Sequence, residues 1–565
     1  RLPAYMKDFG EMLERLGLKC VYHAHISTGE LHLRPVLNLK DENDRVLFRR
    51  VAEETARLVK KHRGSLSGEH GDGRLRGEFI PLLFGEKVYG LMQETKVCWD
   101  PEGVFNARKI VNTPPMDTSL RYEVGDSDVA CRTYFDFSKE KGWLCAIEQC
   151  NGSGDCRKSY AFGGTMCPSF RATREESHTT RARANTLREL ITHPRTKKIY
   201  DQREILEVLD TCVSCKACKS ECPSNVDIAR FKAEFLQQHY DVCGVPMRAF
   251  LIARLTEIQR LGTILPWFYN TIVRNRMTGN MLKRVLHFAP KRTIPTLYKT
   301  TLKHWLGRYR RKNRGEIVGR VFLFADEFTN YMDVEIGIKM IELLDRLGYE
   351  VIIPKHVESG RTAISKGMLK VAKGVARKNV LLLKDLVTEN IPLIGIEPSC
   401  ILSFRDEYPD LVGEDLKEEA VRLGKNCLLY DEFFTREIRA GRIQAEQFTD
   451  QPLKIMLHGH CHQKSLASVE PSREMLSLPV NYSVEVIPSG CCGMAGAFGY
   501  EKKHYELSMK IGEQVLFPAV RGAGEDVCIS APGTSCRQQI KDGTGKQALH
   551  PIEVLYEALK CTKEK

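Results

Sequence analysis

A short stretch near the middle of the chain carries four cysteines and a proline in the pattern C-x2-C-x2-C-x3-C-P. They are Cys212, Cys215, Cys218, Cys222 and Pro223. Soft thiolate ligands this close together suit iron–sulfur clusters, and the cysteine before the proline goes to the other cluster in two-cluster ferredoxins. Structural zinc is the alternative, but zinc ribbons usually pair two separated C-x2-C knuckles. The pattern therefore predicts iron–sulfur chemistry and electron transfer.

A second cysteine group lies upstream and ends in the same Cys-Pro pair. Its members are Cys150, Cys156 and Cys167, followed by Pro168. In two-cluster ferredoxin domains each Cys-Pro cysteine crosses to the other cluster. We therefore expect one cluster on Cys167, Cys212, Cys215 and Cys218, and a second on Cys150, Cys156 and Cys222.

The ligand set of the second cluster is one cysteine short. The spacing C-x2-C-x2-C would place a cysteine at position 153, where the chain has Ser153. Three alternatives stay open. The cluster has three irons; or Ser153, Cys145 or water ligates a fourth iron; or the cluster is absent.

A third cysteine group lies near the C-terminus, where its members follow segments with strand character. They are Cys461, Cys491, Cys492 and Cys536. Adjacent cysteines point in opposite directions from a regular strand. A Cys-Cys-Gly turn at a strand end lets both thiolates face one site, so this group is a candidate metal site.

These segments resemble the cysteine-rich CCG domain of heterodisulfide reductase subunits and of the iron–sulfur subunits of glycolate and glycerol-3-phosphate dehydrogenases. The family pattern is a cysteine, a Cys-Cys-Gly and then C-x2-C, but here Gly533 replaces the first cysteine of the last pair. An earlier copy has Glu358-Ser359-Gly360 in place of Cys-Cys-Gly and keeps Cys400. We expect this earlier copy to bind no metal. For the later copy a cluster, zinc and buried thiols all stay open.

The chain has 20 cysteines in ligand-like groups, which fits a reducing cytosol rather than a disulfide scaffold. We therefore expect a cytoplasmic protein. The cysteines that stand alone are interpreted as small hydrophobic residues. They are Cys20, Cys98, Cys131, Cys243, Cys427, Cys528 and Cys561.

Three histidines near the N-terminus alternate with apolar residues in the sequence VYHAHISTGELHLRP, which predicts two short antiparallel strands. With a two-residue turn at 28–29, His25 would face His32 and His23 would face Arg34. Directly paired residues have Cβ atoms about 5 Å apart. His25 and His32 would then be close enough to share a divalent metal.

A glycine-rich segment, SLSGEHGDGRLRGEF, follows and offers Glu69 and His70. Two imidazoles and a carboxylate leave coordination positions open for a substrate oxygen. His25, His32 and Glu69 are therefore candidate metal ligands.

Together these segments resemble the C-terminal half of the FAD-linked oxidases of the vanillyl-alcohol oxidase superfamily. The most similar group is the D-lactate and D-2-hydroxyglutarate dehydrogenases, whose pattern is roughly H-x-G-D-G-N-L-H followed by S-x-E-H-G. The resemblance implies that His25 and His32 bind the metal. It also implies Glu69 as the third ligand and His70 as the catalytic base.

The cofactor that the resemblance implies is FAD. The segment VFNARKIV matches the family's closing NPGK element at Asn106 and Lys109, which are the candidate cofactor-binding residues here. No glycine-rich loop of the dinucleotide-binding type opens a helix after a strand. Because the chain begins at Arg1 inside an amphipathic pattern, we expect it to be the C-terminal part of a longer polypeptide whose upstream domain binds most of the FAD.

The chain departs from this family in the turn and in one strand. Residues 27–30 replace the Gly-Asp-Gly-Asn turn, and Arg34 stands where some members have asparagine. The departures imply a different clamp for the substrate carboxylate, built by Arg34 with Arg74 or Arg76.

The order of oxidase half, ferredoxin and CCG repeats resembles the long fused flavin and iron–sulfur dehydrogenases. It implies oxidation of a small D-2-hydroxy acid, with electrons passing to an external quinone, cytochrome or electron-transfer protein. We also expect a homo-oligomer. The alternative is a non-catalytic electron-transfer subunit that docks on a separate flavoprotein.

These residues must be positioned by several domains, and we expect a multidomain α+β protein. The segments are an α+β FAD-linked oxidase half (1–120), a helical ferredoxin domain (141–240), a basic helical connector (241–320) and two α/β CCG repeats (321–450 and 451–565). RVFLFA and EVIIPK are predicted strands on either side of a helix, which indicates parallel sheet, and the pattern restarts at KIMLHGHCH.

The net charge of +13 is concentrated in residues 248–314, which hold 16 basic residues and one acid. Interleaved aromatic residues predict amphipathic helices there. A connector packed on other domains is one interpretation, and a face for an anionic membrane is a second. Nucleic acid is not expected, since no recognised motif accompanies the charge. No apolar run reaches the ~18 residues of a bilayer span, so membrane contact is expected to be peripheral, at the inner membrane face.

Overall fold

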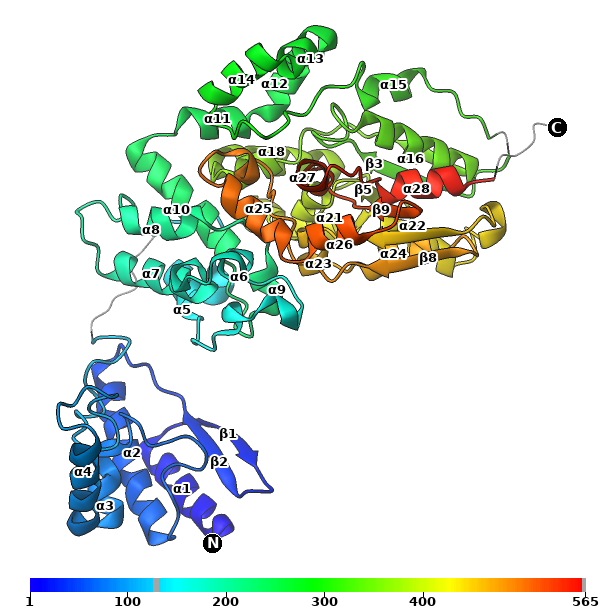
Figure 1. The fold of residues 1–565 in the computed structure, drawn as a ribbon. Coiled ribbons are helices and arrows are strands. Elements are labelled where there is room, and N and C mark those ends of the chain that lie inside the picture. The colour runs from blue at the N-terminus through cyan, green and yellow to red at the C-terminus, as the bar shows by residue number, and fades with distance from the viewer. Residues whose placement is uncertain (125–131, 314, 561–565) are drawn as a thin grey trace. The chain divides into compact units, whose positions relative to one another are not determined.

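The computed structural model describes residues 1–124, 132–313 and 315–560, which form two compact units, Arg1–Asp128 and Val129–Lys565 (Figure 1). Cys131 and Cys561, interpreted above as small hydrophobic residues, lie outside the described residues. Cys427 is buried as that interpretation requires, Cys20 and Cys528 are half-buried, and Cys98 and Cys243 are exposed, which does not fit it.

The first unit combines helices with one two-stranded sheet. Its elements are α1 (Leu2–Leu16), β1 (Cys20–His25), β2 (Glu30–Pro35), α2 (Glu42–Lys61), α3 (Ile80–Phe84) and α4 (Glu86–Trp99). Phe9 and Met12 of α1 pack on Val51 of α2, and Leu33 of β2 packs against the same cluster. Because side chains alternate along a strand, His32 and Arg34 face away from this core.

The register of β1 and β2 differs from the predicted one. The antiparallel pairs include Val21–Arg34, His23–His32 and His25–Glu30. The connection is therefore the four residues 26–29, and the predicted pairs of His25 with His32 and His23 with Arg34 are wrong. The shift is two residues, so the histidines and Arg34 still lie on one face; a shift of one residue would have separated them.

The second unit begins with a helical region that carries most of the cysteines. Its helices are α5 (Trp143–Glu148), α6 (Pro168–Thr173), α7 (Thr180–Thr192), α8 (Arg203–Asp210), α9 (Ala217–Glu221) and α10 (Ile228–Cys243). The basic segment follows as α11 (Met247–Ala253), α12 (Leu255–Gly262), α13 (Pro266–Arg274), α14 (Arg276–Val285) and α15 (Leu302–Arg308). In Figure 1, α11–α14 form a group at the edge of this unit.

Two parallel sheets complete the second unit. The first contains β3 (Gly319–Phe324), β4 (Tyr349–Ile352), β5 (Leu393–Gly395) and β6 (Cys427–Leu429), in the order β4-β3-β5-β6. The second contains β7 (Leu453–Leu457), β8 (Tyr482–Val486) and β9 (Val527–Ser530), in the order β8-β7-β9. In both sheets the first strand is central, the second lies on one side and the third on the other. This shared order is what two copies of one unit would give.

Helices pack on both sheets and join them into one core. Two of them are α16 (Val334–Arg346), which follows β3, and α28 (Pro551–Ala558), near the C-terminus. Leu323 of β3 and Ile455 of β7 belong to one buried cluster. Phe235 of α10 belongs to another with Leu369 of α18 (Leu369–Leu383). The cysteine-rich helices are therefore packed directly on the first sheet's layer of helices.

Candidate functional site

Two histidines and two carboxylates converge on one face of the β1–β2 hairpin. The ring centroids of His25 and His32 are 5.1 Å apart. His32 Nε2 lies 3.5 Å from a carboxylate oxygen of Glu30 and 3.5 Å from one of Glu69. One ligand atom from each of the four residues lies within 4.8 Å of the others. This set of nitrogen and oxygen donors fits a divalent cation with positions left for substrate.

Glu30 is a member of this site that the sequence reasoning missed. It lies opposite His25 in the observed register. The predicted two-residue turn instead paired His25 with His32 and treated Glu30 as part of a changed loop. A four-residue connection would have placed Glu30 on the histidine face, so the loop length was the missing signal.

The predicted base, His70, lies beside one of these carboxylates. Its Nε2 is 3.2 Å from a Glu69 oxygen, and its side chain is 80% exposed. Glu69 is thus shared between His32 and His70. The arrangement places an accessible imidazole next to the candidate metal position.

The three candidate arginines have different partners. Arg34 is exposed on the hairpin face that also carries His32. Arg74 donates to the backbone oxygen and to Oγ1 of Thr118, and Arg76 donates to the backbone oxygen of Gly71 at 3.1 Å. Arg74 and Arg76 are therefore engaged by the surrounding loops, and Arg34 is the arginine that the hairpin presents beside the histidines.

The loop with Asn106 and Lys109 is tied to the glycine-rich loop. The backbone N–H of Ile110 donates to the oxygen of Gly73 at 2.9 Å. Asn106 has a positive φ of 46°, which few side chains other than asparagine adopt readily. The two candidate cofactor residues therefore lie on a turn that is anchored near Glu69 and His70 in the chain.

Four cysteines of the second unit line one pocket, and they are those assigned to the first cluster: Cys167, Cys212, Cys215 and Cys218. All four are buried. Ser214 and Lys216, between the cysteines, have φ of 51° and 65°. This left-handed winding wraps the loop around the cavity. Four buried thiols that converge on one pocket fit the ligand set of a 4Fe–4S cluster.

A buried arginine lies against this cavity. Arg183 of α7 is 1% exposed and donates to Cys167 Sγ at 3.2 Å, to the backbone oxygen of Val208 at 2.8 Å and to Thr211 Oγ1 at 2.8 Å. A buried guanidinium needs an anionic partner. Cysteine thiolates, with or without a cluster, would supply that charge.

The second predicted ligand set is less enclosed. Cys150 and Cys156 are buried, whereas Cys222 is half-buried. Ser153 is exposed on a loop, where its N–H donates to Asn151 Oδ1 at 3.0 Å. Whether this set holds a cluster stays a prediction.

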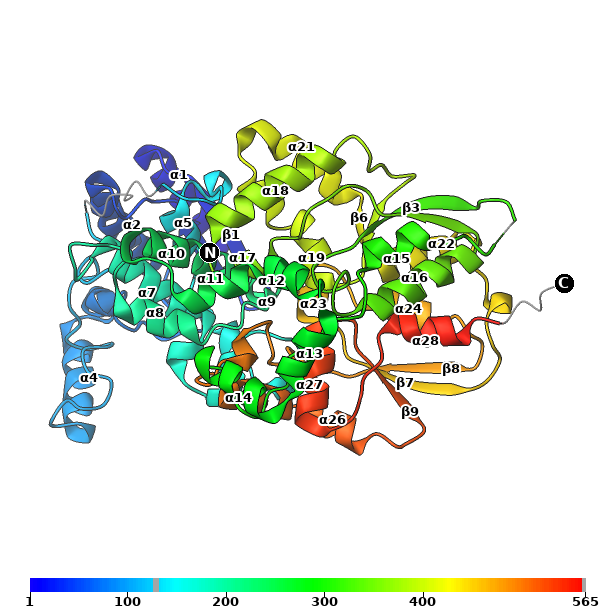
Figure 2. The same cartoon turned by 90° about the horizontal axis from the view of Figure 1, so that it is seen from above.

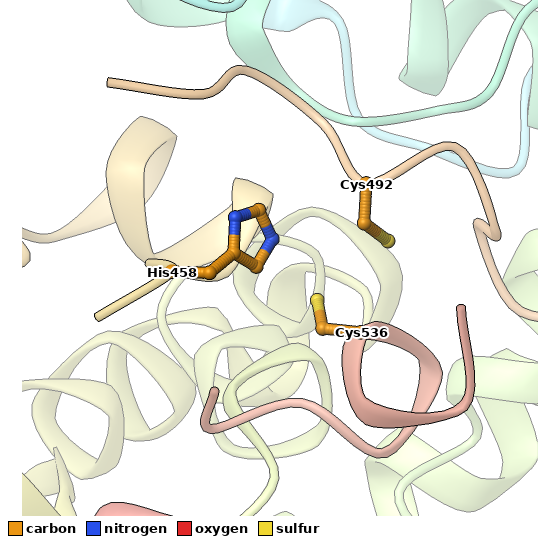
Figure 3. A group of neighbouring side chains, drawn as sticks. All are labelled: His458, Cys492 and Cys536. Atoms are coloured by element: carbon orange, nitrogen blue, oxygen red, sulfur yellow. The ribbon is translucent and has the colours of Figure 1, made fainter. Parts of the chain in front are cut away.

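The C-terminal cysteines meet at the carboxyl ends of the second sheet. β7 leads to His458 and to α23 (Cys461–Leu466), β8 leads to Cys491 and Cys492, and β9 leads to α27 (Thr534–Thr544) with Cys536. Figure 2 shows the three strands converging beside α27. Carboxyl ends of parallel strands are the usual place for ligand sites in α/β folds. Figure 3 shows His458, Cys492 and Cys536 pointing into one space.

The glycine that replaces a family cysteine has a steric explanation. A Cβ on Gly533 would lie 2.5 Å from Cδ2 of His460. The His460 ring therefore fills the space that a cysteine side chain would need. Neither His458 nor His460 was predicted as part of this site, because the cysteine spacing does not include them.

The cluster loop and the C-terminal repeat are hydrogen-bonded to each other. His462 Nε2 lies 3.1 Å from the backbone oxygen of Ser214, and Ser465 Oγ donates to the oxygen of Cys215 at 3.2 Å. Both histidine and serine belong to α23, which begins at Cys461. The first cluster position is therefore directly next to the helix that bears a cysteine of the third group.

Two known families match this chain. Residues 1–110 match the FAD linked oxidases, C-terminal domain, and residues 149–227 match the 4Fe-4S dicluster domain. These matches confirm the predicted resemblance for both segments. They also support FAD and 4Fe–4S clusters as the cofactors of these domains.

Several curated proteins are similar over most of the chain. This chain is 26% identical over 605 aligned residues to the D-2-hydroxyglutarate dehydrogenase of Escherichia coli K12. The alignment covers 99% of this chain and 58% of that protein. The protein of the same name from Pseudomonas putida KT2440 is 27% identical over 604 residues, with 99% and 57% covered. One subunit of the anaerobic glycerol-3-phosphate dehydrogenase of E. coli K12 is 27% identical over 339 residues, with 60% and 83% covered. The chain thus spans little more than half the length of these 2-hydroxyglutarate dehydrogenases.

Proposed function

We propose that this chain is part of an FAD-dependent D-2-hydroxyacid dehydrogenase of the D-2-hydroxyglutarate or D-lactate class. The observation that carries the proposal is the convergence of His25, His32 and Glu69 with His70 beside them. This group lies in a segment that matches FAD-linked oxidases, in a chain that aligns over 99% of its length with a 2-hydroxyglutarate dehydrogenase.

The residues on and beside the hairpin face have three roles: metal binding, proton transfer and binding of the substrate carboxylate. His25, Glu30, His32 and Glu69 hold a divalent metal. His70 takes the hydroxyl proton, a role suited to an imidazole near neutral pH. Arg34 binds the substrate carboxylate through its planar pair of N–H donors. A metal held there would supply polarisation of the substrate hydroxyl, and bound FAD would supply the hydride acceptor that oxidation of an alcohol to a ketone requires.

The FAD is held mainly outside these residues. Asn106 and Lys109, on the loop anchored to Gly73, close this side of the cofactor. Cys167, Cys212, Cys215 and Cys218 hold a 4Fe–4S cluster, which supplies single-electron transfer towards an external acceptor. The hydrogen bonds of Ser214 and Cys215 to α23 give the cluster loop a fixed position against the C-terminal repeat.

We also propose that α11–α14 make a peripheral contact with an anionic membrane surface. Large apolar side chains are exposed there, including Trp267 (67%), Ile264 (72%) and Met277 (83%). They lie within the segment that holds 16 basic residues and one acid. Exposed apolar residues beside basic ones are the composition of interfacial helices. Among the described helices, none is long and apolar enough to cross a bilayer.

Flavin reduction tests the dehydrogenase. In the anaerobic full-length protein, D-2-hydroxyglutarate or D-lactate should bleach the flavin, and the L-enantiomers should not. His70→Ala should slow this bleaching by roughly 10²–10⁴-fold with unchanged flavin content, the usual contribution of a general base. Undiminished bleaching in His70→Ala would show that His70 is not the base. If neither acid bleaches the wild-type flavin, the chain is better explained as an electron-transfer subunit.

A further inference from the structure

We infer that His458, Cys492 and Cys536 bind a single zinc ion at the carboxyl ends of β7, β8 and β9. The inference does not depend on the reaction proposed at His70. It separates the three alternatives that the cysteine pattern left open: a cluster, zinc, or thiols alone.

The three ligand atoms are already close to mononuclear geometry. One atom each from His458, Cys492 and Cys536 lies within 4.8 Å of the other two, and all three residues are buried. In a tetrahedral zinc site, with Zn–S of about 2.3 Å and Zn–N of about 2.0 Å, ligand atoms are roughly 3.5–3.8 Å apart. Small movements of the side chains would bring the three ligand atoms to this tetrahedral spacing. The donors of an iron–sulfur cluster must instead surround the volume of the cluster, as at the cavity near Cys212.

His458 has the hydrogen bonding of a metal ligand. Its Nδ1 lies 2.7 Å from Ser489 Oγ. Its Nε2 is fully buried and has no hydrogen-bond partner among the described residues. A ligating histidine commonly donates from one ring nitrogen to a neighbouring group while the other binds the metal. The unpartnered nitrogen faces the two sulfurs in Figure 3, and a metal would satisfy it.

The surroundings favour one ion with mixed sulfur and nitrogen ligands. His460 fills the space beside Gly533, so the first cysteine of the last pair in the family pattern has no room. Lys464 is bonded to the backbone oxygens of Ser489 and Gly490 and brings a positive charge beside the thiolates. Cys461 and Cys491 lie next to Cys492 and are the nearby thiols available for a fourth position. Two sulfurs and an imidazole in a tetrahedral arrangement are typical of zinc.

Metal analysis of the full-length protein tests this inference. Expressed with zinc and purified anaerobically, the protein should hold one sulfur-bound zinc per chain, beside any zinc that the hairpin site of His25, His32 and Glu69 takes up without sulfur ligands. X-ray absorption at the zinc edge should show sulfur near 2.3 Å together with nitrogen near 2.0 Å. A shell of sulfur alone would place the zinc at other cysteines and overturn the assignment, and so would a protein without zinc. This measurement on the wild type does not depend on any variant folding.

Two variants locate the ion. His458→Asn and Cys536→Ser should each lose about one zinc per chain, the sulfur-bound one, and keep the iron and sulfide content of the wild type. Cys528→Ser changes a half-buried cysteine on β9 and should keep both metals. Full zinc retention in His458→Asn would overturn the inference. Loss of iron rather than zinc in that variant would show a cluster at the site instead.

Discussion

The Nε2 atom of His70 lies 3.2 Å from a carboxylate oxygen of Glu69, and the same carboxylate lies 3.5 Å from His32. Glu69 therefore joins the candidate metal ligands to the candidate base. A change at Glu69 should affect both metal binding and proton transfer, whereas a change at His70 should affect proton transfer alone.

We expect Glu69→Gln to lower both the divalent metal content and kcat/KM. A bound metal supplies several kcal/mol of transition-state stabilisation, so the loss in kcat/KM should be at least about 100-fold. The measurement is metal analysis beside steady-state kinetics with D-2-hydroxyglutarate. Glu11→Gln, at an exposed carboxylate on α1 with Lys7 as its neighbour, should leave both unchanged. A Glu69→Gln protein with wild-type metal content would contradict the ligand assignment.

Arg183 should set the reduction potential of the first cluster. Its buried guanidinium donates to Cys167 Sγ, and hydrogen bonds and charge next to the sulfurs make reduction easier. Arg183→Met should therefore shift the midpoint potential to more negative values, measured by an EPR-monitored redox titration. Arg183→Lys, which keeps the charge, should shift it less. Arg188→Met, on the same helix, should leave it unchanged, and an unchanged potential in Arg183→Met would refute the prediction.

Lys216 should be a major stabilising contact between the cluster loop and the first repeat. Its Nζ lies 2.7 Å from Asp406, 3.2 Å from Asp227 and 3.3 Å from Glu407, and it is 3% exposed. Lys216→Met leaves these buried carboxylates without their central cation, which should cost about 3–5 kcal/mol of unfolding free energy. Denaturant unfolding measures this loss.

Lys219 provides a matched control, because it contacts the same Asp406 with a side chain that is 38% exposed. Lys219→Met should cost less than about 1 kcal/mol, as partly exposed ion pairs do. Equal losses in the two lysine variants would show that burial does not decide the effect.

Glu501 should make stability depend on pH in the acid range. Burial raises its pKa, but the hydrogen bond from His504 and the charges of Lys366 and Arg248 outweigh burial and bring the pKa to about 2, from 4.5. A carboxylate with a lowered folded-state pKa stabilises the fold above pH 4.5, and this contribution is lost as the pH falls towards 2. The full contribution is on the order of 3 kcal/mol.

Comparison with Glu501→Gln isolates this effect. The stability difference between wild type and Glu501→Gln should be largest near pH 6 and should shrink steadily between about pH 4.5 and 2, because both proteins are then uncharged at this position. Glu506→Gln, at an exposed carboxylate on the following helix, should follow the wild type throughout. A difference that stays constant with pH would contradict the predicted linkage.

The basic helices should bind anionic vesicles. Burying an apolar side chain such as Trp267 contributes about 1.5–3 kcal/mol, so Trp267→Ser should weaken co-sedimentation with phosphatidylglycerol vesicles about tenfold or more. Neutral phosphatidylcholine vesicles should bind weakly, and salt should weaken the anionic binding. Val480→Ser changes an equally exposed apolar residue in the second repeat and should have no effect. Equal binding to both vesicle types would exclude the anionic surface.

The sequence predicted which residues belong to each site better than it predicted which residues lie opposite them. Cysteine spacing was enough to select Cys167, Cys212, Cys215 and Cys218, which line one cavity. The hairpin register was wrong because the turn was given two residues, although the four residues 26–29 connect the strands. His25 and His32 meet all the same, since a two-residue slip preserves the face of a strand.

Other members of the sites had no sequence signal of their own. Glu30 needed the correct loop length to reach the histidine face. His458 and His460 lie outside the cysteine pattern, and they join the C-terminal site because three parallel strands end at the same edge. Such partners depend on tertiary packing, which spacing along the chain does not report.

The two repeats carry different donors at equivalent strand ends. After β3, β4 and β5 come Glu327, Ser359 and Cys400, and Ser359 donates to Glu327 through its N–H and its hydroxyl at 2.9 and 2.7 Å. After β7, β8 and β9 come an imidazole and thiols. The same strand order thus carries an oxygen-rich group of hydrogen-bonded side chains in the first repeat and a sulfur-rich group in the second. Exchanging a few side chains at three strand ends is enough to turn a set of structural polar contacts into coordination chemistry, so the first repeat is a natural starting point for engineering a second metal centre.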